Sequence, residues 1–460
     1  MDCASSHKLE GYKLSNSSAL PRSWIEFEEY TRALMEETHI PGAAVAVSHE
    51  GEPIYAKGFG VSDLATKKPV DPNTIFGIAS VSKSFTALAI MGLQDKGLLS
   101  LDDPVIKYIP EWTISGVSDM SAIKIKHLLS HTTGVPPLRR REDLFRFDEH
   151  LEFFANEPIV PLGKPGEYLS YCNDTFLLLG AIIQRLTRKL FTRHMTVEIL
   201  DKLDMNRSTY GLDDLRKFDN VTVPYVYSEK EGRLESVPWP QLGNYEVGGG
   251  VRSSVLDLMK YSQVYLNSGI YEGKTIVSAE AIQAMQQRVH QIGRNTYYCY
   301  ALEVTPDYEG VTLVEHGGGQ PGVSSNFGFV PEEKISVAVL TNVSDAPASR
   351  IWLAAVNSYL GLPIDRERSY EPQYETDLED MLKFCGTYEC DEGSKFTISK
   401  TDTGIKITVG GHDYDLRASS EDTLVFQRNK MDQVIKFYFD DSGKPWAAFF
   451  HLRMLRRTSK

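Results

Sequence analysis

The chain has 460 residues, more than one hydrophobic core usually accommodates, so we expect two domains. Its composition, with 42% hydrophobic and 24% charged residues, is typical of a globular protein, and no apolar run is long enough to span a membrane. The net charge of −13 argues against nucleic acid or an anionic membrane as a partner.

Cysteine usage and the N-terminal residues bear on the cellular compartment. The five cysteines are odd in number and scattered, which favours a reduced environment over a disulfide framework. The first ten residues lack the apolar core of a signal peptide. We therefore expect a cytoplasmic protein. Because no cysteine or histidine cluster has metal-ligand spacing, we expect neither a metal nor another cofactor.

The first half of the chain predicts a polar tail at residues 1–24 and then a mixed α/β region. A helix is expected at Trp24–Glu37, followed by two strands around the turn at His49-Glu-Gly51. These strands are Ala43–Ser48 and Pro53–Gly60. A second helix follows Ser80 and ends at Gly97, as helices often do. A helical region then extends to about Leu203, and Asp174–Lys189 is its clearest helix.

The second half predicts a hairpin, a helix, several antiparallel strands and a last helix before the composition changes. The hairpin is expected at Val221–Val237, and the helix begins at Ser253 or Ser254. The last helix is expected at Ala348–Leu360. The antiparallel strands are expected at Tyr297–Val304, Val311–Glu315, Ser325–Val330 and Ile335–Leu340. Residues 363–380 are polar and contain prolines, which is typical of a linker. Short alternating runs after it predict a small all-β barrel. The expected boundaries are thus 25–362 for the first domain and 381–460 for the barrel.

Ser80-Val-Ser-Lys83 is the most informative motif. Residues three apart share a helix face, so the amine of Lys83 can lie beside the hydroxyl of Ser80 and activate it as a nucleophile. The same spacing occurs in Ser5/Lys8, in the polar N-terminal tail, and in Ser121/Lys124, which precedes the helix that ends at Ser130-His-Thr-Thr-Gly134. Only Ser80 follows an extended segment and begins an apolar helix, where free N–H groups stabilise developing negative charge.

Tyr171-Cys-Asn173 immediately precedes the buried helix and is a candidate source of a phenol and an amide for the same cleft. A neighbouring lysine ammonium is expected to lower the pKa of the phenol, so that the two groups titrate as a pair. Tyr265-Leu-Asn267 has the same spacing but lies at a helix end before Ser268-Gly269. Tyr168 is a closer rival, and composition does not distinguish it from Tyr171.

His316-Gly-Gly-Gly319 follows a predicted strand. Glycines allow a backbone to approach a ligand closely and to present bare N–H groups, although such a run also suits a flexible turn.

Taken together, these motifs resemble those of class C β-lactamases and penicillin-binding-protein-like serine hydrolases. The motifs are Ser80-Val-Ser-Lys83, His127-Leu-Leu-Ser-His131-Thr-Thr-Gly134, Tyr171-Cys-Asn173 and His316-Gly-Gly318, and they occur in the family's order over roughly residues 25–362. The resemblance implies an α/β sandwich in which an antiparallel sheet is flanked by helices, with a helical subdomain. The C-terminal part resembles the lipocalin-like barrel that some relatives carry.

By this resemblance Ser80 is the acyl-forming nucleophile, and Lys83 and Tyr171 transfer its proton. The N–H groups of Ser80 and Gly319 are expected to form the oxyanion hole. Substrate contacts are expected from Asn173 and from the His316-Gly-Gly318 strand.

True β-lactamases usually have Lys-Thr-Gly in place of His316-Gly-Gly318, and a neutral histidine binds a drug's carboxylate poorly near pH 7. This difference favours esters, thioesters or amides that lack such a carboxylate. The long aromatic segments 135–165 and 221–246 are expected to set specificity, with Trp239 and Tyr245 as candidates to wall an apolar acyl pocket.

The favoured hypothesis is a serine hydrolase that cleaves a small-molecule ester or amide through a Ser80 acyl-enzyme. An acyltransferase, transesterase or thioesterase is an alternative, because transfer and hydrolysis share the first half-reaction. A D-aminopeptidase and a non-catalytic scaffold are further alternatives within the wider family. Assembly into a homo-oligomer is also considered.

Overall fold

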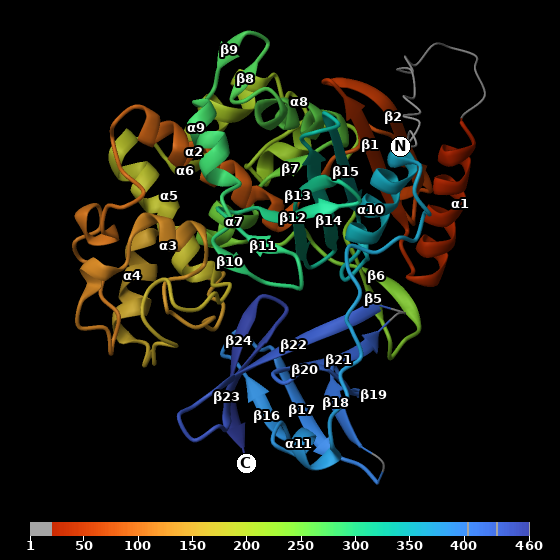
Figure 1. Ribbon diagram of the computed structural model, residues 1–460. Helices are drawn as coiled ribbons and strands as arrows, with labels where there is room; N and C mark the ends of the chain where they lie inside the picture. Colours follow the sequence, from red (N-terminus) through yellow and green to blue (C-terminus); the bar gives the residue numbers. More distant parts are fainter. Residues whose placement is uncertain (1–20, 403, 429–430, 460) are drawn as a thin grey trace, which may run out of the picture.

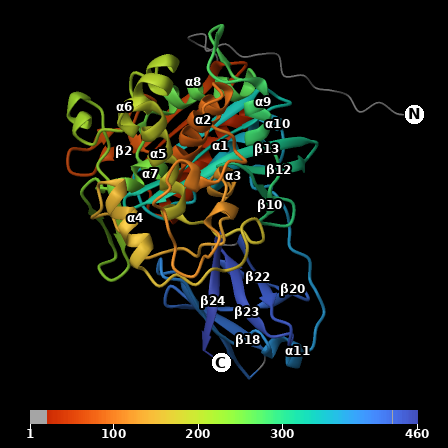
Figure 2. The same cartoon turned by 90° about the vertical axis from the view of Figure 1, so that its left-hand side faces the viewer.

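The computed structural model describes residues 21–402, 404–428 and 431–459. The predicted tail up to residue 20, with Cys3 and the Ser5/Lys8 pair, lies outside the described residues. The described chain forms a larger α/β unit and a smaller all-β unit, which lies at one end of the larger unit in both views (Figures 1 and 2).

A nine-stranded antiparallel sheet forms the centre of the α/β unit. In spatial order the strands are β10 (His290–Gln291), β11 (Tyr297–Tyr298), β12 (Glu303–Tyr308), β13 (Val311–Gln320), β14 (Val323–Val330), β15 (Ile335–Thr341), β1 (Gly42–His49), β2 (Glu52–Asp63) and β3 (Lys68–Pro69). Both predicted N-terminal strands and the later antiparallel strands are present in this sheet.

The central strand β1 is apolar at nearly every position because both faces of the sheet are covered. Successive side chains of a strand point to opposite faces. Ala44 and Ala46 accordingly belong to one buried cluster, whereas Ala43, Val45 and Val47 belong to another. Helices α1 (Arg22–Glu37) and α10 (Ala348–Leu360) cover the second face, and α8 (Val255–Leu266) covers the first (Figure 1).

Helix α2 (Ser82–Asp95) packs behind α8, and the ring of Phe85 stacks on that of Tyr261 at 3.7 Å. The helical subdomain lies beside it and matches the predicted helical region (Figure 1). Its helices are α3 (Ile125–Leu129), α4 (Phe147–Asn156), α5 (Asn173–Thr187) and α6 (Phe191–Met195). The short helices α7 (Glu246–Gly249) and α9 (Ala279–Met285) contact α2 from other sides.

Three small two-stranded sheets complete the α/β unit. They pair β4 (Phe76–Gly77) with β7 (Arg252–Ser253), β5 (Tyr225–Ser228) with β6 (Arg233–Ser236), and β8 (Ile270–Tyr271) with β9 (Lys274–Thr275). The pair β5–β6 is the predicted hairpin, and Ser254 caps α8 by accepting a hydrogen bond from Asp257 N.

The C-terminal unit is a nine-stranded antiparallel sheet that curls into a nearly closed barrel. Its strands in spatial order are β19 (His412–Asp415), β18 (Ile405–Val409), β17 (Lys395–Lys400), β16 (Gly386–Glu389), β24 (Arg453–Ser459), β23 (Pro445–Phe450), β22 (Met431–Phe439), β21 (Thr423–Arg428) and β20 (Arg417–Ser420). The short helix α11 (Leu378–Leu382) precedes it. The predicted all-β barrel is thus confirmed.

The barrel docks on the helical subdomain through an apolar cluster that both units share. Leu162, Leu169 and Tyr171 on one side pack with Phe449 and Met454 on the other. Two hydrogen bonds join the two units here. One links the backbones, from Tyr171 N to Leu452 O at 2.7 Å, and the other runs from Met454 N to the side-chain Oγ of Ser170 at 3.0 Å. The turn between β23 and β24 therefore lies beside a predicted catalytic residue.

Among the described residues, none of the helices combines the length and the apolar character that crossing a bilayer needs.

Candidate active site

Ser80 lies in a 3₁₀ turn, Ala79–Val81, that leads directly into α2. Ala79 has a φ of +46°, in the left-handed region that costs a residue with a Cβ about 1–2 kcal/mol. Backbone strain of this kind persists where the surrounding structure holds the residue in place. Here it turns the chain sharply, so that Ser80 faces a cavity while Val81 and Ser82 are buried.

Lys83 is 1% exposed, one turn along the same helix. Its Nζ lies 3.3 Å from Ser80 Oγ, 2.8 Å from Asn173 Oδ1 and 3.3 Å from the carbonyl oxygen of Gly248. Burial lowers the pKa of Lys83 well below its usual value, and the nearby guanidinium groups of Arg140 and Arg453 lower it further. Both effects favour the neutral form of this amine, which is the form that can act as a base.

Helix α7 brings its backbone against this amine, and glycine at position 248 makes the approach feasible. A Cβ at Gly248 would lie 2.9 Å from Lys83 Nζ and 3.2 Å from Lys83 Cε. Any larger residue would displace the lysine from the serine.

Tyr171 lines the same cavity, and its Oη has no hydrogen-bond partner in the described part of the chain. The Lys83 amine lies 4.8 Å from the centre of its ring. Burial raises the pKa of Tyr171, and the nearby Ser80 hydroxyl offsets only part of this effect. The expectation that a lysine ammonium lowers this pKa is therefore wrong, because burial disfavours the phenolate and also disfavours the charged form of Lys83.

The rival tyrosine lies elsewhere. The ring of Tyr168 contacts Tyr438 and Trp446 of the barrel at 5.2 and 5.7 Å, and Tyr168 does not line the cavity of Ser80. The structure thus brings Tyr171, rather than Tyr168, next to Ser80 and Lys83.

Asn173 links the lysine to the barrel. Its Oδ1 accepts from Lys83, and its Nδ2 donates to Glu392 Oε1 at 2.8 Å. The other oxygen of Glu392 accepts from Arg453 Nε at 2.7 Å. Because a carboxylate only accepts hydrogen bonds, Glu392 holds the amide with its oxygen toward the lysine. Two barrel residues therefore complete the surroundings of Lys83.

His316 is buried, and the protein satisfies both of its ring nitrogens. Nδ1 lies 2.6 Å from the carbonyl oxygen of Gly317, which can only accept, so Nδ1 carries the proton. Nε2 then accepts from the hydroxyl of Tyr298 at 3.1 Å. Burial lowers the pKa of His316 to about 4. The imidazole is neutral near pH 7, as the sequence predicts.

Strand β13 carries the glycine motif past Ser80. A Cβ at Gly318 would lie 2.3 Å from Ile78 O and 3.1 Å from Ser80 N, so only glycine fits at this crossing. Gly319 lines the cavity and has open space around it. The backbones of Ser80 and the glycine strand thus adjoin each other, as an oxyanion hole requires.

The cavity that contains these groups has a volume of about 930 Å³. Every predicted site residue except Trp239 lines it, and the ring of Trp239 lies beside Gly77 instead. Tyr245 lines the cavity, but its hydroxyl donates to Asp174 Oδ1 at 2.6 Å and the Arg140 guanidinium lies over its ring at 4.4 Å. The wall combines apolar side chains, among them Leu242, Met431 and Leu452, with charged and polar ones.

Sequence reasoning missed the residues that distant segments bring to this cavity. They include Arg140, Glu303, Gln320, Asp345, Arg428, Gln433 and Arg453 at its wall, and Glu392 behind Asn173. Arg140 belongs to the basic run Arg139-Arg-Arg141, and it is half-buried. The sequence contains no motif from which the proximity of residues 392 and 453 to residue 173 could be predicted.

Within the described ranges, no group of three or more histidine, cysteine, aspartate or glutamate side chains is arranged to hold a metal ion.

Comparison with known proteins identifies relatives of the α/β unit. A family model described as Beta-lactamase matches residues 27–357. A protein named Beta-lactamase from Yersinia enterocolitica is 27% identical over 341 residues, covering 67% of this chain and 84% of that protein. Protein flp from Staphylococcus aureus (strain MW2) is 27% identical over 316 residues, covering 67% of this chain. The match spans 61% of the length of flp, less than two thirds.

Solved structures extend the similarity over the barrel. An octameric penicillin-binding protein homologue from Pyrococcus abyssi is 30% identical with a TM-score of 0.70, covering 94% of this chain and 99% of that one. SurE is 21% identical with a TM-score of 0.73, covering 95% of this chain and 99% of that one, and it shares the fold. SurE has also been solved with D-Leu.

Proposed function

Because this chain belongs to the β-lactamase family, we propose that it is a serine hydrolase that cleaves a small-molecule ester or amide through an acyl-enzyme on Ser80. The environment of Lys83 is the main support for this proposal. Its amine is buried, its pKa is lowered, and its Nζ lies 3.3 Å from Ser80 Oγ. A serine hydroxyl needs such a neighbouring base to become a nucleophile.

The hydrogen bonds of Lys83 support its role as that base. A neutral amine has two N–H donors and one lone pair. Asn173 Oδ1 and the carbonyl of Gly248 can only accept, so they take the two N–H groups. The lone pair is left for the third neighbour, Ser80 Oγ. In this arrangement the hydroxyl donates to the amine and is ready to lose its proton.

Acylation then proceeds in balanced steps. Ser80 Oγ bonds to the substrate carbonyl carbon as its proton moves to Lys83 Nζ, and the carbonyl oxygen becomes an oxyanion bound by the N–H groups of Ser80 and Gly319. The proton then passes to the leaving alcohol or amine, with Tyr171 as the relay, and the bond to the leaving group breaks. A neutral phenol without a competing partner suits this relay, because it donates one proton as it accepts another.

Substrate class follows from the neutral His316. Both of its nitrogens are already bonded within the protein, so it offers no positive charge to a substrate carboxylate. We therefore favour esters, thioesters and amides over β-lactam drugs. Transfer of the acyl group to an alcohol or amine uses the same intermediate, and product analysis with and without an added nucleophile separates transfer from hydrolysis.

Labelling with a fluorophosphonate probe tests the proposal. The expected result is one adduct, located on Ser80 by mass spectrometry, which disappears in Ser80→Ala. Ser121→Ala is the matched control, because Ser121 has the same spacing to a lysine but bonds to Asp119 outside the cavity. A folded wild-type protein without an adduct on Ser80 would overturn the enzyme assignment in favour of a scaffold.

Two further proposals rest on the relatives. A panel of D-aminoacyl and short-chain aryl esters ranks the D-aminopeptidase alternative against a simple esterase. Since the Pyrococcus abyssi homologue is octameric, we also propose that this chain forms a homo-oligomer, which light scattering of the purified protein tests.

A further inference from the structure

Two carboxylates face each other across neighbouring strands of the central sheet. Glu303 on β12 is paired in register with Glu315 on β13. Glu315 is fully bonded, because Arg368 donates to both of its oxygens at 2.7 Å and Asn326 Nδ2 donates to Oε2 at 2.8 Å. One guanidinium therefore balances one of the two negative charges.

Glu303 has no such compensation. Among the described residues, its carboxylate accepts no hydrogen bond and forms no ion pair. Like charges on directly opposed residues of a sheet are destabilising, and a half-buried charge without a partner costs more still. A ligand that supplies a positive charge would remove this cost.

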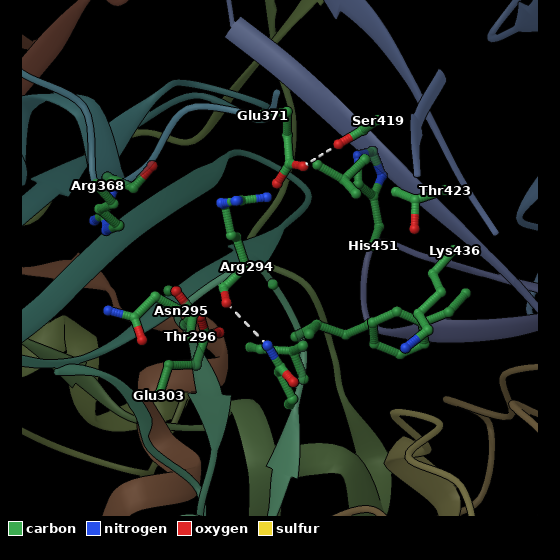
Figure 3. A pocket seen from close by; sticks show the side chains of 18 of the residues that line it. Arg294, Asn295, Thr296, Glu303, Arg368, Glu371, Ser419, Thr423, Lys436 and His451 are labelled. Carbon is green, nitrogen blue, oxygen red and sulfur yellow. Dashed lines mark hydrogen bonds between the residues drawn. The ribbon is translucent and has the colours of Figure 1, made fainter. Parts of the chain in front are cut away.

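The position of Glu303 places it where a ligand could reach it. It lines the cavity of Ser80 and also a second cavity of about 930 Å³ between the sheet edge and the barrel (Figure 3). Gly317 and Leu452 are likewise shared by both cavities. A molecule bound with its carbonyl at Ser80 can thus extend past Glu303 toward the barrel.

Arg368 lines the second cavity but donates to both oxygens of Glu315, and among the described residues no charged group of this cavity forms an ion pair with Glu303. Figure 3 shows Glu303 beside Asn295 and Thr296, with Lys436 and His451 coming from the barrel. Arg294 and Lys436 are exposed, and neither pairs with Glu303. Asn295 and Thr296 add an amide and a hydroxyl beside this carboxylate, and both groups offer an oxygen to an N–H donor.

We propose that Glu303 is the binding site for a protonated amine of the substrate, whose scissile carbonyl lies at Ser80. This assignment rests on the proposed function and names its substrate class as cationic amino esters or amides. An ammonium group has three N–H donors, and the unpaired carboxylate and its polar neighbours provide acceptors. One carboxylate alone is a weak metal ligand, whereas a charge-assisted hydrogen bond to an ammonium needs no further ligands.

The proposal also implies a dependence on pH. Burial and the charge of Glu315 raise the pKa of Glu303 to about 7, and Arg368 acts in the opposite direction. Tyr171, Tyr298 and Cys299 also face this carboxyl group, and burial keeps all three neutral near pH 7. Below about pH 7 Glu303 is protonated and cannot attract a cation. The preference for cationic substrates should therefore increase as the pH rises through this value.

The test compares p-nitrophenyl ω-aminoalkanoates of several chain lengths with the uncharged alkanoates of equal length. In Glu303→Gln, kcat/KM for the best cationic ester should fall roughly 10- to 100-fold, as expected for loss of one charged hydrogen bond. The uncharged ester should change less than about 2-fold, because only the ammonium uses this contact. Glu371→Gln is the matched control, since Glu371 lines the same cavity but accepts from Ser419 Oγ at 2.6 Å.

Each other outcome has a distinct meaning. Equal losses for both esters would show a structural role for Glu303, and no preference for the cationic ester in wild type would also overturn the proposal. The ratio of the two rates should rise with pH in wild type and stay flat in Glu303→Gln; a flat wild-type ratio contradicts the assignment. Fluorophosphonate labelling of Ser80 should persist in every variant, so loss of the amine site is distinguishable from failure of the hydrolase proposal.

Discussion

Replacing Glu392 tests whether the barrel controls the catalytic amine. Glu392 is 9% exposed and uses one oxygen for Asn173 Nδ2 and the other for Arg453 Nε. In Glu392→Gln the side chain keeps its shape but has a single acceptor oxygen for these two donors. One donor is therefore left without an acceptor in a buried site, at a cost of about 1.5–3 kcal/mol.

If the lost hydrogen bond raises the free energy of the transition state by this amount, kcat/KM should fall roughly 10- to 150-fold. The assay is steady-state hydrolysis of an uncharged p-nitrophenyl ester, with thermal unfolding measured alongside to confirm that the variant is folded. Glu389→Gln is the matched control, because Glu389 precedes Glu392 on the same barrel edge but pairs with Lys395 on the surface.

The same variant should shift the pH profile. The charge of Glu392 raises the pKa of Lys83, whereas Arg140 and Arg453 lower it. Removing the negative charge lowers this pKa further. In the proposed mechanism the neutral amine is the active form, so activity should rise as the pH increases through the pKa of Lys83. The acid limb of the variant should therefore lie at lower pH than that of the wild type. An unchanged rate together with an unmoved acid limb would refute the link between barrel and lysine.

Three other substitutions have defined outcomes. Tyr171→Phe should remove most activity because the proton relay is lost, whereas Tyr168→Phe should retain it because that ring only packs on the barrel; the opposite result in an ester assay would reassign the relay. Gly248→Ala should abolish activity and leave the far-ultraviolet circular dichroism unchanged, because its Cβ would meet Lys83 Nζ at 2.9 Å; near-normal kcat contradicts this. Ala79→Gly should raise the free energy of unfolding by about 0.5–1 kcal/mol, measured by urea denaturation, because glycine relieves the positive φ; a loss of stability argues against strain at this turn.

Local patterns were sufficient to predict the elements and the residues that share a short segment. Ser80 and Lys83 meet because they are three residues apart at the start of one helix, and Tyr171 and Asn173 flank the start of another. The buried helices and the central strands were equally recognisable in the sequence. Their residues are apolar because the helices pack on the sheet and both faces of the sheet are covered.

Long-range contacts and electrostatics were beyond the reach of such patterns. Glu392 lies 219 residues from Asn173 along the chain, and its role depends on how the barrel docks. The positive φ of Ala79 comes from the packing around it, because alanine has no preference for that region. The pKa of Tyr171 was predicted in the wrong direction, since a sequence shows which charges are near but not how deeply they are buried.

The docking of the turn between β23 and β24 beside Tyr171 has a consequence for the order in which the protein matures. During synthesis the α/β unit leaves the ribosome long before Glu392 and Arg453 do, so its lysine and asparagine first exist without their final partners. The surroundings of Lys83 are therefore complete only after the strand that carries Arg453 has been released.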